Sequence, residues 1–284
     1  MKHYALPGHE DSLLPEGKQW KLVWNDEFDG TELDESKWNF RRNFWGRPCP
    51  WFTDQGVHLD NDSCLHIELL RGADGSYSAA QLQTGSLLYD TPPETNHDGL
   101  PEGGIWPFGR NQPMKFLHRY GYYECRCRLN REFGWWVAFW LQSPSIGAHP
   151  DPRRAGIESD IMESQEYAKD RSIRCGNIYG GYGHDAVYPG HSHPFVEETP
   201  DGFHRFGLDW SPGGYHFYVD GKKVKEILSP VSETEQFILL TAEPMGYRAT
   251  PSRPVPELDR IQLPDSFVVD YVRVFDEEEE AAKA

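Results

Sequence analysis

Short runs of alternating apolar and polar residues, most of them closed by turn residues, recur along this chain of 284 residues. Alternation with a period of two is typical of β-strands, and no stretch of ten residues shows a convincing helical period. The clearest hairpin surrounds Asp220-Gly221, because this dipeptide favours a tight two-residue turn. The pattern predicts an all-β sandwich or barrel. The runs are WKLVW, CLHIELL, YGYYECRCRL, WWVAFWL, RFGLDW, YHFYVDG, FILLTAE and FVVDYVRVF.

The two ends of the chain depart from this pattern. Residues 1–19 are polar, contain Gly and Pro, and show no periodicity, which predicts an arm that lies on the domain. Residues 20–276 show neither an internal repeat nor a linker and predict a single domain. Residues 277–284 predict an acidic, solvated tail. Inside the domain, residues 91–116 form a Pro- and Gly-rich loop that is too long for a simple connection and predicts ligand contacts.

Charge and hydropathy exclude several classes of partner. Lys and Arg number 28 against 45 Asp and Glu, which gives a net charge of −17. Such a surface repels phosphate backbones and anionic membranes, so we expect no nucleic-acid partner and no membrane partner. No run approaches the roughly 18 to 20 apolar residues of a membrane span, and the first residues lack the apolar core of a signal peptide. The sequence as it stands therefore predicts a soluble, unexported protein.

The cysteines bear on the cellular compartment. The chain has five cysteines, an odd number without metal-ligand spacing, and we expect them to be free, buried thiols. Free thiols fit the cytoplasm, although a secreted protein whose signal peptide had been removed would look the same at its N-terminus. Both localisations stay open.

Aromatic residues are more abundant than a core requires. They make up 14% of the chain and include 10 Trp and 14 Tyr. Surplus aromatic rings often line grooves for ligands with flat apolar faces. Sugar rings are ligands of this kind.

The run IESDIMESQEY at residues 157–167 breaks the alternation of a strand by one residue. Glu158 and Asp160 share a face, but the third carboxylate, Glu163, comes one residue late. A β-bulge at Ile161-Met162 would return Glu163 to the face of the other two acids. The sequence therefore predicts a bulge that gathers three carboxylates on one face.

Three carboxylates at this spacing repel one another and raise one another's pKa, a cost that catalysis can use. A retaining glycosidase needs one ionised carboxylate as nucleophile and one protonated carboxyl as acid, about 5 to 5.5 Å apart. Asp160 could hold Glu158 by a hydrogen bond and help keep Glu163 protonated. The alternatives are a solvated acidic strand or a cation site. The neighbouring run GWWVAFWLQS, apolar on both faces, favours a central place in the sheet and the catalytic interpretation.

Five segments resemble glycoside hydrolase family 16 in their order along about residues 20–275. They are WKLVWNDEFDGTELDESKW, YGYYECRCRLNREFGWWVAFWL, ESDIMES, HRFGLDWSPGGYHFYVDG and FVVDYVRVF. The resemblance implies a β-sandwich jelly roll of two curved antiparallel sheets, similar to concanavalin A, with a concave substrate cleft. It also implies that residues 20–276 are the catalytic domain and hydrolyse internal β-linkages of a glucan or galactan with retention.

Carried over to this chain, the resemblance makes Glu158 the nucleophile, Asp160 the assisting aspartate and Glu163 the acid/base. The bulged Glu-x-Asp-x-x-Glu form is similar to the laminarinase- and agarase-like branch, which favours β-1,3-glucan as the substrate. A carbohydrate-binding lectin of the same fold and a transglycosylase are the alternatives. We expect no cofactor for catalysis and a monomeric protein. Tyr179 stands where many family members carry a histidine.

The resemblance also indicates residues that contact substrate. Trp136 and Trp140 match two tryptophans of the cleft, with plain core packing as the alternative. Trp45 and Trp51 lie where members place a sugar platform, with local packing of a Pro-rich loop as the alternative. Alternation from Glu163 places Gln165 in the cleft. The full set of expected substrate contacts is Trp136, Trp140, Trp45, Trp51, Gln165 and His184.

Two positions bear on metal binding. Glu27 and Asp270 match acids that ligate a structural calcium ion in several members, and two ordinary surface acids are the alternative. His184, His191 and His193 lie close together in the sequence, but they lack the ordered spacing of a zinc site. At these three histidines we therefore expect a sugar contact from His184 and no metal.

Overall fold

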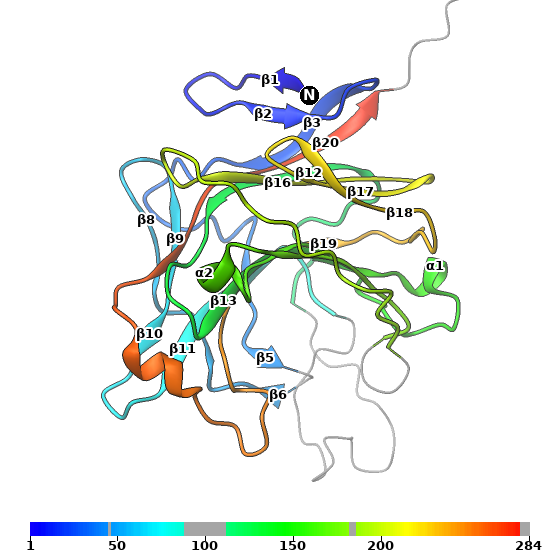
Figure 1. Ribbon diagram of the computed structural model, residues 1–284. Coiled ribbons are helices and arrows are strands. Elements are labelled where there is room, and N and C mark those ends of the chain that lie inside the picture. The colour runs from blue at the N-terminus through cyan, green and yellow to red at the C-terminus, as the bar shows by residue number, and fades with distance from the viewer. Residues whose placement is uncertain (45–46, 88–111, 182–185, 279–284) are drawn as a thin grey trace, which may run out of the picture.

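Two antiparallel sheets packed face to face form the protein, as the prediction of an all-β sandwich requires (Figure 1). The computed structural model describes residues 1–44, 47–87, 112–181 and 186–278. We call the sheets the β12 sheet and the β13 sheet after their central strands. All but one of the strand pairings in these residues are antiparallel, and the parallel pair joins β7 to β11. Every apolar run named above coincides with a strand.

The β12 sheet has the order β18-β17-β16-β12-β20-β9-β8, with β3 also paired to β20. Its strands are β3 (Gln19–Asp26), β8 (Val57–Leu59), β9 (Leu65–Glu68), β12 (Gly121–Arg128), β16 (His204–Ser211), β17 (Gly214–Val219), β18 (Lys222–Ile227) and β20 (Ser266–Glu278). The predicted hairpin is confirmed: Val219 pairs with Lys222, and Asp220 and Gly221 have φ angles of 47° and 78°. Positive φ at both turn positions is what a type I′ hairpin needs.

The β13 sheet has the order β10-β11-β19-β13-β14-β15, with β4 and β7 paired to β11. Its strands are β4 (Asn39–Phe40), β7 (Phe52–Thr53), β10 (Leu70–Arg71), β11 (Tyr77–Gln83), β13 (Trp135–Gln142), β14 (Glu158–Glu163), β15 (Arg174–Ile178) and β19 (Phe237–Pro244). The remaining elements are short: β1 (Lys2–Tyr4), β2 (Ser12–Leu14), β5 (Asn43–Phe44), β6 (Arg47–Pro48), the helices α1 (Pro152–Ala155) and α2 (Tyr167–Asp170), and a 3-10 helix at Pro256–Arg260.

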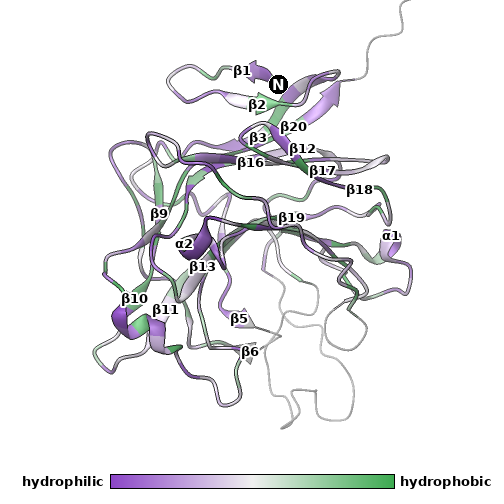
Figure 2. Cartoon of the chain, viewed as in Figure 1, coloured by the Kyte–Doolittle hydropathy of each residue, from purple (hydrophilic) through white to green (hydrophobic). Residues whose placement is uncertain are grey.

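The hydrophobic core lies between the two sheets. Strand β13 contributes Val137 and Phe139 from one side, and β20 contributes Val272 and Val274 from the other, all fully buried. Burying one such side chain contributes about 1.5–3 kcal/mol, so the layered core is the main stabilising element. Figure 2 shows hydrophobic segments along the strands, while α2 is hydrophilic. Among the described residues, no helix is long and apolar enough to cross a membrane.

The N-terminal residues lie against the β12 sheet. Strands β1 and β2 pair with each other above this sheet (Figure 1), and Leu13 N donates to Glu124 Oε1 at 2.9 Å. At the other end, Glu277 pairs with Trp20, so β20 continues to Glu278. The predicted tail was therefore wrong for residues 277 and 278, because backbone pairing with β3 holds them in the sheet despite their charge. All five cysteines are free.

Candidate active site

The predicted bulge lies in β14. On one side, Asp160 pairs with Trp140 and Glu163 pairs with Ala138, so three steps along β14 match two along β13. The other neighbour, β15, shows the same shift between the partners of Asp160 and Glu163. Both registers confirm the bulge at Ile161-Met162.

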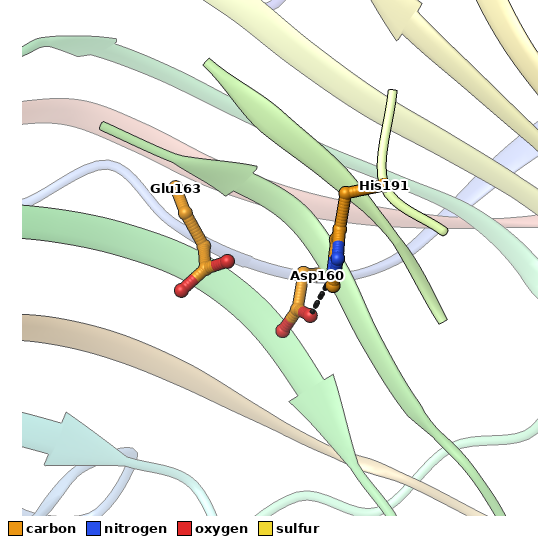
Figure 3. A group of neighbouring side chains, drawn as sticks. All are labelled: Asp160, Glu163 and His191. Carbon is orange, nitrogen blue, oxygen red and sulfur yellow. Dashed lines mark hydrogen bonds and ion pairs between the residues drawn. The ribbon is translucent and has the colours of Figure 1, made fainter. Parts of the chain in front are cut away.

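The bulge separates the apolar residues of β14 from its acids. Ile161 and Met162 are 1% and 0% exposed and belong to the core between the sheets. Glu163 returns to the side of Asp160, and Figure 3 shows the two carboxyl groups close together beside the strand. Glu158 pairs with Gln142 at the start of the strand, and Gln142 Nε2 donates to Glu158 Oε2 at 3.4 Å. The bulge therefore gathers the three predicted acids on the face of the β13 sheet opposite the core.

The environment of these acids favours a protonated Glu163. Burial, followed by the charge of Asp160, raises the pKa of Glu163 to about 8. Burial also raises the pKa of Asp160 to about 7, against the opposing effect of Arg248 and with a contribution from Glu243. A carboxyl group that keeps its proton near neutral pH can act as a general acid. Glu163 has this property.

His191 lies next to Asp160, and the sequence did not indicate this contact. Its Nε2 is 3.0 Å from Asp160 Oδ2, drawn as the dashed line in Figure 3. Burial lowers the pKa of His191, which favours a neutral ring. The ligand atoms of Asp160, Glu163 and His191 all lie within 4.8 Å of one another, so these three could together hold a metal ion. In the sequence, His191 stands out only as one of three neighbouring histidines that were considered as zinc ligands. Its contact with Asp160 across β15 was not predictable, because it depends on the tertiary structure.

A further acid, Glu243, faces the same site from β19. It stands opposite Trp136 in the ladder with β13 and is 4% exposed. Its Oε2 accepts hydrogen bonds from the hydroxyl of Tyr247 and, at 3.1 Å, from Arg248 Nη2. Arg248 therefore brings a positive charge to a site that holds four carboxyl groups.

The predicted cleft residue Trp136 is packed against its neighbours. It is 6% exposed, and its ring stacks on Tyr247 with the centroids 6.2 Å apart. The guanidinium of Arg248 lies 5.5 Å from the centroid of the Trp136 ring. Trp51, 9% exposed, is tilted against the same Tyr247. Substrate contact by Trp136 and Trp51 stays a prediction.

Trp140 has a similar environment further along β13. It is 7% exposed, its Nε1 donates to Thr241 Oγ1 at 3.1 Å, and Arg41 lies 5.8 Å from its ring centroid. Both tryptophans that match the family's cleft residues therefore have an arginine beside the ring. This arrangement was not evident from the sequence, because Arg41 and Arg248 come from distant segments.

The other expected substrate contacts have different outcomes. The prediction for Gln165 assumed that the alternation of the strand continues past Glu163. Strand β14 ends at Glu163, and Gln165 lies half-buried in the turn that follows. That geometric premise was wrong, because the strand stops before Gln165. Trp45 and His184 lie outside the described residues.

The two acids expected to bind calcium are paired with arginine side chains. Arg273 Nε donates to Glu27 Oε1 at 2.8 Å and Arg273 Nη2 donates to Glu27 Oε2 at 2.7 Å. Asp270 Oδ2 accepts from Arg126 Nη1 at 2.6 Å. Calcium takes six to eight oxygen ligands, and a guanidinium on both oxygens of Glu27 occupies the place of a cation. The residues present do not fit a calcium ion at Glu27 and Asp270.

Comparison with known proteins agrees with this geometry. Residues 109–250, half of the chain, match the model of glycosyl hydrolases family 16. The chain is 30% identical over 209 residues to a glucan endo-1,3-beta-glucosidase of Cryptopygus antarcticus, with 71% of this chain and 67% of that protein covered. It is 23% identical over 262 residues to beta-porphyranase B of Zobellia galactanivorans, with 86% and 80% covered.

Among solved structures, the catalytic domain of an endo-1,3-beta-glucanase (laminarinase) from Thermotoga petrophila RKU-1 has the same fold. The TM-score is 0.64 at 24% identity, with 92% of this chain and 100% of that chain covered. The fold, the bulged acidic strand and the match over half of the sequence lead to one conclusion. The chain belongs to glycosyl hydrolase family 16.

Proposed function

We propose that this glycoside hydrolase is a retaining endo-hydrolase of β-1,3-linked glucan, with Glu158 as nucleophile and Glu163 as acid/base. The observation that carries the proposal is the bulge at Ile161-Met162, which brings Glu163 to the face of Glu158 and Asp160. In a regular strand of the same sequence, without this bulge, Glu163 would point into the core and the strand would offer only two acids.

The reaction follows from the protonation states. Glu163 donates its proton to the glycosidic oxygen while Glu158 attacks the anomeric carbon, which breaks the glycosidic bond and forms a glycosyl-enzyme. Glu163, now ionised, takes a proton from water, and the hydroxide displaces Glu158 to give a product of retained configuration. Burial and, after it, the charge of Asp160 raise the pKa of Glu163 and so favour its protonated form before each cycle.

Two observations bear on the substrate. The relative that is 30% identical is a glucan endo-1,3-beta-glucosidase, and a net charge of −17 opposes the approach of polyanions, which together favour a neutral glucan. A sulfated galactan such as porphyran is the second candidate, since Arg41 and Arg248 lie beside the two cleft tryptophans. A guanidinium is a good partner for a sulfate group.

The test is release of reducing ends from laminarin, lichenan, agarose, porphyran and carrageenan. We expect the highest rate on laminarin, with early products of intermediate length, and loss of activity in Glu158→Ala and Glu163→Ala. Glu197→Ala, an exposed acid whose side chain is 75% exposed, is the matched control and should keep full activity. Binding of a glycan without release from any would overturn the enzyme assignment in favour of a lectin. Salt-sensitive activity on porphyran that exceeds activity on laminarin would favour the second candidate.

A further inference from the structure

Residues 190–192, which follow β15 in the chain, are held beside the active site by three contacts. Cys175 and Ser192 exchange two backbone hydrogen bonds of 3.1 and 3.0 Å, so the chain at Ser192 lies along the edge of the β13 sheet. Lys225, from β18 of the other sheet, donates to Gly190 O at 2.6 Å and to Ser192 Oγ at 3.4 Å. The two residues that flank His191 are therefore both anchored.

A missing side chain on β15 makes room for His191. Gly176 pairs with Asp160, so a side chain at this position would stand next to the Asp160 carboxyl. A Cβ atom on Gly176 would lie 3.0 Å from His191 Cδ2 and 3.4 Å from Gly190 O. The backbone of Gly176 is not in the left-handed region, so its conformation does not demand glycine. The space that it leaves is filled by the imidazole.

The imidazole reaches Asp160 through this space. The distance of 3.0 Å between Nε2 and Oδ2 is that of a hydrogen bond, and a neutral ring protonated on Nε2 can donate it. The other charged groups that face His191 are Glu158 and Glu163 from β14, Arg174 from β15 and Lys225 from β18. A donor fixed on Asp160 sets the direction of its carboxyl group relative to both glutamates.

We propose that His191 is a positioning residue for the hydrolysis: it holds the Asp160 carboxyl by an Nε2–H donor, and Gly176 is glycine in order to admit its ring. This inference rests on the proposed function, since it assigns a role within the same site. His191 acts through Asp160 and takes no part in bond making or breaking.

The kinetic test compares variants that remove the imidazole with variants that displace it. His191→Ala should lower kcat by about 10- to 100-fold, the scale of one hydrogen bond to a charged group, with KM changed less than threefold. His191→Gln keeps an N–H donor at a similar reach and should recover most of the lost kcat. Gly176→Val should lower kcat like His191→Ala, and Gly176→Ala should have a smaller effect because its single methyl displaces the ring less.

A double-mutant cycle gives the sharpest result. Gly176→Val in the His191→Ala background should cost little further activity, because no ring remains to be displaced. Fully additive losses, or a His191→Ala variant with the kcat of the unchanged protein, would overturn the proposal. Lys225→Met, which releases the loop, should also lower kcat. Its matched control is Lys222→Met on the same strand, where the partner is the exposed Glu197.

An NMR measurement of the His191 tautomer tests this proposal independently of the proposed function. Long-range proton–nitrogen spectra report which ring nitrogen of His191 carries the proton, whatever the substrate, with His191→Gln to assign the signal. We expect the Nε2–H form in the unchanged protein and a mixture of tautomers in Gly176→Val. The same tautomer mixture in both proteins would overturn the role of His191. Failure to hydrolyse any glycan, with the expected spectra, would instead contradict only the proposed function.

Discussion

At the scale of single residues, the two glutamates are distinguished by the face of the sugar that each one serves. Glu163→Ala should still form the glycosyl-enzyme from an activated aryl glycoside, because such a leaving group needs little protonation. Added azide should then give a β-glycosyl azide of retained configuration. In Glu158→Ala, azide can enter only from the vacated face and should give the inverted product. Product configurations determined by NMR check the assignment, and the opposite pair of outcomes would exchange the two roles.

The alkaline limit of activity should depend on the burial of Glu163 and also on the charge of Asp160. Glu163 works in its protonated form, which is present below its pKa of about 8 and is lost as the pH rises through that value. Asp160→Asn removes a negative neighbour, so the pKa of Glu163 should fall and the alkaline limb of kcat/KM should move to lower pH. The variant should bind substrate and turn over slowly. An alkaline limb that stays in place would contradict this electrostatic role.

At the scale of the element, the bulge places Met162 in the hydrophobic core and the adjacent Glu163 in the active site. Met162 is fully buried in the core, so Met162→Ala should lower the free energy of unfolding by about 2–5 kcal/mol while the rate per folded molecule stays within a few-fold. Chemical denaturation and kcat on the same samples measure both effects. Loss of activity without loss of stability would mean that Met162 faces the site.

Glu163→Gln should show the reverse behaviour. Because the pKa of Glu163 is raised in the folded protein, ionisation of this carboxyl opposes folding. Its contribution to stability is fully present below the unfolded pKa of about 4.5 and is lost as the pH rises to about 8. Glutamine has no such dependence. The stability of the variant relative to the unchanged protein should therefore rise with pH over this range. The variant should also be inactive on polysaccharide, because it lacks the general acid. Denaturation curves at several pH values test this, and a relative stability that falls with pH would contradict it.

At the scale of the whole molecule, a buried arginine fastens the N-terminal residues to the β12 sheet. Arg273 is fully buried, binds both oxygens of Glu27, and donates to Glu10 O and to Ser12 Oγ. Arg273→Met should cost about 3–5 kcal/mol, because it takes the guanidinium away from a buried carboxylate and leaves Asn25 and His9 as its remaining partners. Since a guanidinium binds both oxygens of Glu27, we expect no calcium ion there, and the Tm should be the same with calcium and with a chelator. A Tm that rises on adding calcium and loses that gain in Glu27→Gln would contradict this interpretation.

The sequence predicted those features that depend on local order. The period of two placed the strands, the Asp220-Gly221 turn set a hairpin, and the late carboxylate located the bulge. Features made by contact between distant segments were not predictable in this way. His191 reaches Asp160 only because Gly176 lacks a side chain, and Arg248 reaches Trp136 only because β19 pairs with β13. The end of β14 at Glu163, which removed Gln165 from the alternation, is likewise set by the fold.

The bulge brings Glu163 to the face of Glu158, where we propose that Glu158 is the nucleophile and Glu163 the acid. The most direct measurement is mass spectrometry of the peptide labelled by a 2-deoxy-2-fluoro β-1,3-gluco-oligosaccharide carrying an activated leaving group. The fluorine slows both steps, and the good leaving group lets the glycosyl-enzyme accumulate. We expect one sugar attached to Glu158, and no label in Glu158→Ala. A label on Glu163 or Asp160 would contradict it.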